Sequence, residues 1–172
     1  MNFRLMTYDD IPAYQTLLHN AYQAVSQLGI HFAAATVDQF TIADHIESNA
    51  VYVSEKDSEL VSTLSIRFPW GNNPGPYGLP HLGWFATNPQ YKGQGYGNAL
   101  WDWVENQILI NQLKLPAVTL GTAQNHPWLA QIYINKGYRP IGQADLTPDH
   151  TTLYLEKILN HKNYTQWKSR SN

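Results

Sequence analysis

The sequence predicts a mixed α/β fold of the α+β class, formed by residues 1–172 as a single domain. Runs of β-branched and apolar residues alternate with segments in which apolar residues recur at the three- and four-residue spacing of a helix. The clearest such order is a strand-like run at 81–87, a helical pattern that fades near Leu115, and a second strand-like run at 117–122. This is a βαβ unit, so its two strands are expected to be parallel and joined by a right-handed crossover.

Local patterns define each expected element in turn. Thr7 and Asp10 form a capping-box-like pair ahead of the first helix, with Pro12 in its first turn. Gly137 is the expected terminator of the last helix. The expected strands lie at 2–6, 50–54, 60–68, 81–87, 117–122, 138–144 and 151–158, and the expected helices at 7–29, 36–47, 98–115 and 127–136.

Two segments do not fit a regular element. The stretch 69–80 holds four prolines and three glycines, and a loop of this length in a compact domain is often functional. The tail 160–172 is polar except for Trp167, and the pattern leaves open whether it is loose or docked.

Composition excludes several classes of function. A net charge of −2 without a basic run gives no surface for nucleic acid or an anionic membrane. The absence of cysteine excludes disulfides, thiolate nucleophiles and zinc–thiolate sites. The histidines other than His81 show no metal-ligand spacing, so no metal is expected. No stretch has the length of a signal peptide core or a membrane span, and a cytoplasmic protein is expected.

A glycine-rich turn at 88–98 is the strongest candidate for a binding site. Gly93, Gly95 and Gly97 let backbone amides approach a ligand, and the following helix directs its positive N-terminal end there. A P-loop is excluded because Gly97 is followed by Asn98 and not by Lys-Ser/Thr. The G-x-G-x-G spacing disfavours a dinucleotide fingerprint, and a tight turn without any ligand stays the alternative.

The residues around this turn resemble those of a known family. F-A-T-N-P-Q-Y-K-G-Q-G-Y-G-N-A-L is similar to the acetyl-CoA motif of the GNAT acetyltransferases, with Lys92 where glutamine or arginine is usual and Thr87 where valine is usual. Downstream, G-T-A-Q-N-H-P-W-L-A-Q-I-Y-I-N-K-G-Y resembles the second CoA motif of the family, although Asn125 lies one residue farther from Tyr133 than is common.

The resemblance implies a GNAT fold, in which a mostly antiparallel sheet has a central parallel strand pair splayed around the CoA site and helices cover both faces. It also implies direct acetyl transfer from acetyl-CoA to a primary amine of a small molecule or peptide. A non-catalytic acyl-CoA-binding regulatory module is the alternative, and a homodimer is left open. The residues implied in cofactor binding are Phe85, Ala86, Thr87, Lys92, Gly93, Gln94, Gly95, Tyr96, Gly97, Asn98 and Asn125.

The chemistry of amine acetylation directs attention to two proton-transfer groups. At pH 7 a lysine-like amine is neutral in about one molecule in 2,500, so supplying the neutral form costs about 4.6 kcal/mol. His81, six residues before Thr87, occupies the position where several members of the family place a base, although it is also explained by packing alone. Tyr133 matches the family's general acid, which donates to the departing thiolate. With no cysteine and no Ser/His/Asp set, an acyl-enzyme is not expected.

The acceptor side is less constrained by the sequence. The first two helices and the 69–80 loop are expected to form it, and Tyr22, Phe32, Trp70 and Tyr77 are candidates for an aromatic wall. Ordinary packing explains these aromatic residues equally well. The sequence does not identify the acceptor.

Overall fold

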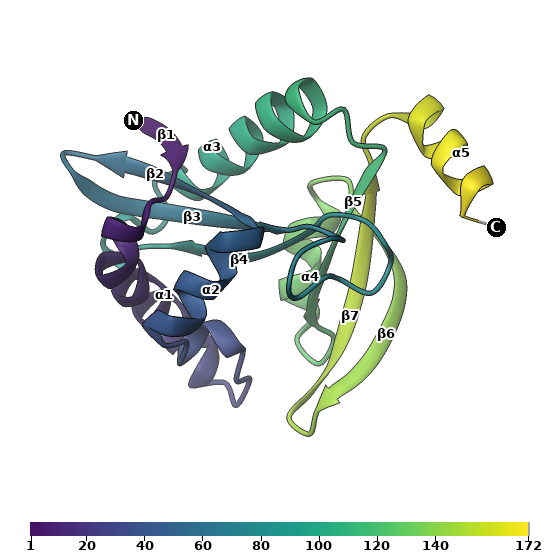
Figure 1. Cartoon of the computed structure of the whole chain (residues 1–172). Helices are drawn as coiled ribbons and strands as arrows, with labels where there is room; N and C mark the ends of the chain where they lie inside the picture. Colours follow the sequence, from purple (N-terminus) through teal and green to yellow (C-terminus); the bar gives the residue numbers. More distant parts are fainter. Residues whose placement is uncertain (172) are drawn as a thin grey trace.

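The computed structural model describes residues 1–171, and within them seven strands form one sheet in the order β1-β2-β3-β4-β5-β7-β6 (Figure 1). Every neighbouring pair is antiparallel except β4–β5, which is parallel. The predicted mostly antiparallel sheet with one central parallel pair is therefore confirmed. The strands are β1 Asn2–Leu5, β2 Ala50–Lys56, β3 Glu59–Arg67, β4 His81–Thr87, β5 Ala117–Ala123, β6 Arg139–Thr147 and β7 His150–Ile158.

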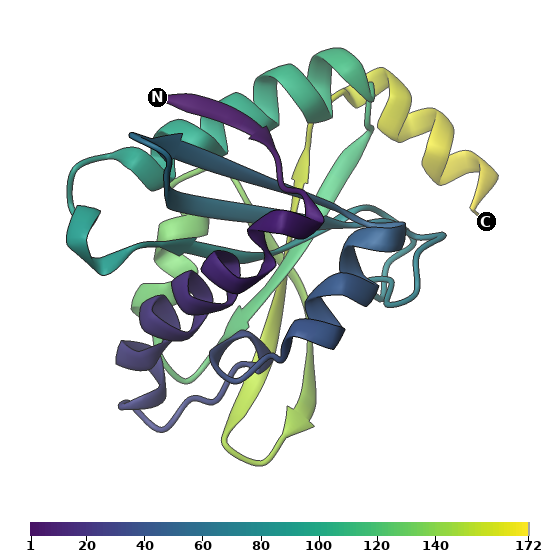
Figure 2. The ribbon, with the colours of Figure 1, turned by 60° about the vertical axis from the view of Figure 1, so that its left-hand side comes forward.

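Helices cover both faces of the sheet, as predicted. Figures 1 and 2 show α1 and α2 on one face and α3 on the other, with α4 beside β5. The helix α3 begins at Tyr96, earlier than expected, and continues as a π-helical segment, Val104–Gln112. The helices are α1 Ile11–Ser26, α2 Gln39–Ser48, α3 Tyr96–Trp103, α4 Pro127–Ile134 and α5 His161–Arg170.

The two-residue alternation of strand side chains divides the core between the faces. On β2, Val51 and Val53 pack in the cluster under α1 and α2, whereas Tyr52 packs in the cluster under α3. On β3, Leu64 and Ile66 face the α3 side. Consecutive residues of a strand point to opposite faces, so Ser65 and Arg67 face the α1–α2 side.

The parallel pair separates soon after it forms. Only His81↔Thr119 and Leu82↔Leu120 pair between β4 and β5. Beyond them β4 carries an irregularity opposite β3, and Trp84 there adopts a φ of +46°, in the left-handed region that a bulky side chain seldom occupies. The rest of β4 is not paired with β5, so the splayed pair implied by the family resemblance is present.

The polar tail forms a helix at the edge of the molecule. In Figure 1, α5 extends beyond the end of β7. Asn160 caps it by accepting from the backbone N–H of Asn163, and the Tyr164 hydroxyl donates to Glu156 Oε1 at 3.1 Å on β7. Within residues 1–171, no helix has the length and apolar character needed to cross a bilayer.

Candidate active site

A cavity of about 630 Å³ opens where β4 and β5 separate. Residues of α1, the 30–37 segment, β3, β4, β5 and α4 line it, and most of them are apolar. Among the described residues, its wall includes Arg67 and Lys92 but no aspartate or glutamate. A volume of this size lies in the range of small-molecule sites.

The glycine-rich turn at 88–98, called the glycine loop below, adjoins one end of the cavity, where Pro89 and Lys92 contribute to the wall. Gly93 and Gly95 have φ of +79° and +84°, and their missing Cβ atoms would meet only open space, so glycine is required here by backbone conformation. At Gly97 the reason is different, because a Cβ there would lie 2.7 Å from Thr87 Oγ1. Close approach of α3 to β4 places the first turn of the helix, whose N–H groups have no partner within the helix, beside the end of β4.

The side chains of the loop differ in what they contact. Lys92 lines the cavity. Tyr96 accepts a hydrogen bond from Lys56 Nζ at 3.2 Å, and Asn98 Oδ1 accepts from Lys136 Nζ at 2.8 Å. These features fit a ligand that carries a pyrophosphate: backbone donors at a helix start and a lysine beside them.

Asn125, expected to bind the cofactor, lies outside this group of residues. Its Oδ1 accepts from the backbone N–H of Thr151 at 3.1 Å and so ties the β5–α4 turn to β7. It does not line the cavity. The contact holds the Asn125 side chain on β7, and cofactor binding by Asn125 stays a prediction.

The strand segment Phe85–Thr87 forms the adjoining wall of the cavity. Here β4 has left β5, so its backbone groups on that side have no strand partner. The carbonyl of Phe85 accepts a hydrogen bond from the Tyr22 hydroxyl at 3.2 Å. Burial raises the pKa of Tyr22, so this hydroxyl stays protonated.

His81 lies at the other end of β4, in the cavity wall, and is 5% exposed. Its Nδ1 lies 2.7 Å from Thr119 Oγ1, and Gly75 of the 69–80 loop packs so closely on its ring that a Cβ there would be 2.7 Å away. Burial, with the positive charge of Arg67 as a second cause, lowers the pKa of His81 to about 3. The imidazole is therefore neutral at physiological pH and has a proton-accepting nitrogen.

Tyr133 also lines the cavity, from α4. Its ring packs on Trp101 with the ring centroids 5.6 Å apart. Burial raises its pKa to about 12. The phenol therefore stays protonated, as a hydrogen-bond donor requires.

The candidate aromatic wall divides into two groups. Tyr22 and Phe32 line the cavity in an edge-to-face pair, with centroids 6.0 Å apart. Trp70 is 76% exposed and stacks on Phe68 instead. Tyr77 packs on Tyr154 of β7, so neither of these two loop residues lines the cavity. The 69–80 loop contributes Asn73 to the wall and packs Gly75 on His81.

The cavity wall also contains functional candidates that the sequence patterns did not indicate. Trp84 stacks on His45 at 4.3 Å, and His45 Nε2 lies 2.6 Å from Ser65 Oγ. Burial, followed by the charge of Arg67, lowers the pKa of His45 to about 4. The available signal was on β3, where Thr63, Ser65 and Arg67 interrupt an apolar run at alternate positions.

Comparison with known proteins is consistent with this geometry. The family model of the acetyltransferase (GNAT) family matches residues 17–129. S-(2-succino)cysteine N-acetyltransferase of Bacillus subtilis (strain 168) is 43% identical over 159 residues, which cover 92% of this chain and 96% of that protein. S-alkylcysteine N-acetyltransferase of the same organism is 43% identical over 137 residues, covering 79% and 77%.

Solved structures with low identity share the fold. Ribosomal-protein-S18-alanine N-acetyltransferase from Escherichia coli superposes with a TM-score of 0.72 at 13% identity, covering 92% of this chain and 94% of that one. A Salmonella typhimurium structure solved with its cofactor acetyl-CoA gives 0.68 at 15% identity, covering 94% and 95%. The chain belongs to the GNAT family of acetyltransferases, as an N-acetyltransferase that moves the acetyl group of acetyl-CoA to an amine of a small molecule.

Proposed function

We propose that the acceptor is the α-amine of an S-substituted cysteine. The observation that carries this is that two relatives at 43% identity are named for acceptors with different S-substituents on the same amino acid. What the two acceptors share is the cysteine itself, with its free amine. A cavity of about 630 Å³ with a largely apolar wall is large enough for such a thioether.

The cofactor is proposed to lie along the far half of β4. The free backbone edge at Phe85–Thr87 would pair with the pantetheine arm, and the start of α3 with Gly93, Gly95 and Lys92 would hold the pyrophosphate. The close contact of Gly97 with β4 supports this assignment, because it brings these two sets of donors next to each other.

Acetyl-CoA supplies the activated acetyl group, and the transfer forms an N–C bond, breaks the C–S bond and releases CoA as its thiol. His81 is proposed to accept the proton that the amine loses, directly or through water, because its ring is neutral and lies in the cavity wall. Tyr133 is proposed to donate a hydrogen bond to the departing sulfur. A backbone N–H of Phe85–Thr87 would polarise the thioester carbonyl.

An acceptor panel tests the proposal. Purified protein would be given acetyl-CoA with S-methyl-, S-benzyl- or S-(2-succino)-L-cysteine, a peptide with a free N-terminus, or a polyamine, and thiol release would be followed. The S-substituted cysteines are expected to exceed the other amines in kcat/KM by at least about tenfold, which is about 1.4 kcal/mol. A peptide or polyamine that matches or exceeds them would overturn it.

The non-catalytic acyl-CoA-binding module is not supported, because the relatives are enzymes. A homodimer and a cytoplasmic location stay predictions.

A further inference from the structure

Arg67 is a partly buried cation that forms no ion pair with any carboxylate among residues 1–171. Its Nε is fully buried and has no hydrogen-bond partner within residues 1–171. Two other arginines are ion-paired: Arg4 with Asp10 at 2.8 Å, and Arg139 with Glu156 at 3.0 Å. A guanidinium removed from water normally has an anionic partner, and a bound anionic ligand would supply one that the described part of the chain does not.

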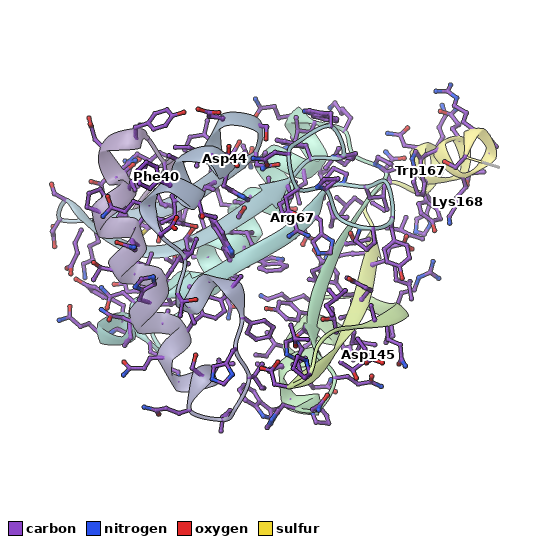
Figure 3. All side chains as sticks on the ribbon, turned by 60° about the horizontal axis from the view of Figure 1, so that its bottom comes forward. Phe40, Asp44, Arg67, Asp145, Trp167 and Lys168 are labelled. Carbon is purple, nitrogen blue, oxygen red and sulfur yellow. The ribbon has the colours of Figure 1, made fainter. Side chains whose placement is uncertain are left out.

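The position of Arg67 directs it to the active-site cavity. It is the last residue of β3 and pairs across the strands with His81, the first residue of β4. Directly paired residues place their side chains on the same face of a sheet, and both residues line the cavity. In Figure 3, Arg67 lies where the ribbons of the first four strands approach those of β5 and β7.

The two cations of the cavity wall lie at opposite ends of β4. Lys92 follows the C-terminal end of this strand, in the glycine loop, whereas Arg67 lies beside its N-terminal end. The seven residues of β4 span roughly 20 Å at the usual rise of a strand. A pyrophosphate beside Lys92 therefore leaves Arg67 free for a second anionic group.

We propose that Arg67 binds the carboxylate of the acceptor, and that this group is the α-carboxylate of the amino acid. The inference rests on the proposed function and extends it, because it restricts the substrate class to free α-amino acids. A guanidinium presents two parallel N–H donors that match a carboxylate. Since the α-carboxylate and the α-amine are attached to the same carbon, a carboxylate on Arg67 holds the amine next to His81, its cross-strand neighbour.

The test compares acids with their decarboxylated analogues. S-benzyl-L-cysteine and S-benzylcysteamine share the amine and the thioether and differ in the α-carboxylate. The wild-type protein is expected to prefer the acid by about 100-fold in kcat/KM, as for loss of a charge-assisted hydrogen-bonded pair. Arg67→Gln is expected to reduce this preference to within about threefold, and Arg67→Lys to leave it at an intermediate value.

The measured quantity is the preference for the acid in the wild type divided by the same preference in the variant, and effects common to both proteins or both substrates cancel from it. The two amines differ in their own pKa, but that difference acts equally on wild type and variant, and a general loss of folding lowers both substrates together. Arg170→Gln, on the exposed surface of α5, is the matched control and is expected to keep the full preference. Wild type that acetylates both compounds equally would overturn the inference without any variant, as would an Arg67→Gln protein that retains the preference.

A second pair of substrates separates the two sources of carboxylate. S-(2-succino)-L-cysteine and S-(2-succino)cysteamine both keep the carboxylates of the substituent, and only the first has the α-carboxylate. Dependence on Arg67 for the first compound alone supports the inference, whereas equal dependence for both assigns Arg67 to the substituent and overturns it. Failure of every S-substituted cysteine as an acceptor, with another amine turned over, would instead contradict the proposed function.

Discussion

Removal of the Tyr133 hydroxyl gives the sharpest test of how the departing thiolate is stabilised. Tyr133→Phe deletes one oxygen and keeps the ring that packs on Trp101. Burial alone accounts for the raised pKa of Tyr133, and no hydrogen bond to residues 1–171 accompanies it. The substitution therefore breaks no interaction on which folding depends, and the melting temperature is expected to stay close to that of the wild type.

The expected loss of rate follows from the two pKa values. With Tyr133 at about 12 and a thiol near 8.5, complete proton transfer to the thiolate is uphill by about 3.5 units, or about 5 kcal/mol. The phenol is therefore expected to act as a hydrogen-bond donor, and not as a source of a fully transferred proton. A hydrogen bond to a charged group contributes about 1.5–3 kcal/mol, so kcat is expected to fall by about 10- to 150-fold.

Steady-state thiol release at saturating acetyl-CoA measures this effect, and Tyr138→Phe is its matched control. Tyr138 packs on the same Trp101 at 5.9 Å, but its buried hydroxyl has no partner within residues 1–171 and it does not line the cavity. Its removal is expected to leave kcat unchanged and stability equal or higher. A Tyr133→Phe enzyme within twofold of wild-type kcat would refute the role assigned to the phenol.

Three further predictions concern stability. His81 has a pKa of about 3 in the folded protein, below the ordinary 6.5, so its contribution to the free energy of unfolding is complete above pH 6.5 and is lost as pH falls. About 2 kcal/mol of the free energy of unfolding is expected to be lost between pH 7 and pH 5. Denaturant titrations of His81→Gln should show a correspondingly weaker pH dependence, and an unchanged pH dependence would contradict a buried neutral ring. Lys157→Met should destabilise the protein by about 2–3 kcal/mol, because it leaves the buried Glu105 carboxylate, which also accepts from the Trp101 indole, without its cation. The double variant with Glu105→Gln should recover most of this stability in urea unfolding. Additive losses in the double variant would contradict the pairing. Gly97→Ala should cost about 1–3 kcal/mol by thermal unfolding, since its Cβ would lie 2.7 Å from a threonine oxygen on β4, and an unchanged midpoint would show that helix and strand can separate without cost.

The fold could be predicted largely from local patterns. The βαβ order and the glycine spacing depend on residues close in sequence. The positive φ values at Gly93 and Gly95 are accessible because glycine has no Cβ. The helix α3 begins at Tyr96, two residues before the predicted start at Asn98, because Gly95 is its N-cap residue. The π-helical segment Val104–Gln112 was not predicted, because apolar residues at helical spacing do not distinguish a π-helix from an α-helix.

The acceptor end could not be predicted in the same way. Trp70 and Tyr77 were candidates because they lie in a long loop, but a loop's path depends on distant contacts, here with Phe68 and β7. Nothing in the sequence distinguishes Arg67 as a binding residue, because an arginine at a strand end usually extends into water. Only the fold shows that it lies across from His81 within a cavity wall that has no acidic residue in the described chain.

The charges of this cavity connect acceptor selection with acceptor activation. A wall with two cations and no carboxylate among residues 1–171 disfavours an ammonium ion and so favours the neutral amine that attacks. The same Arg67 charge is the second cause, after burial, of the low pKa of His81, which makes the free enzyme's imidazole a weak base. A carboxylate bound to Arg67 offsets that charge, so its arrival raises the proton affinity of the neighbouring ring. An amine without a carboxylate leaves the charge in place. The contact that selects the amino acid is therefore also the one that improves its base, and discrimination against decarboxylated acceptors should appear in kcat as well as in KM.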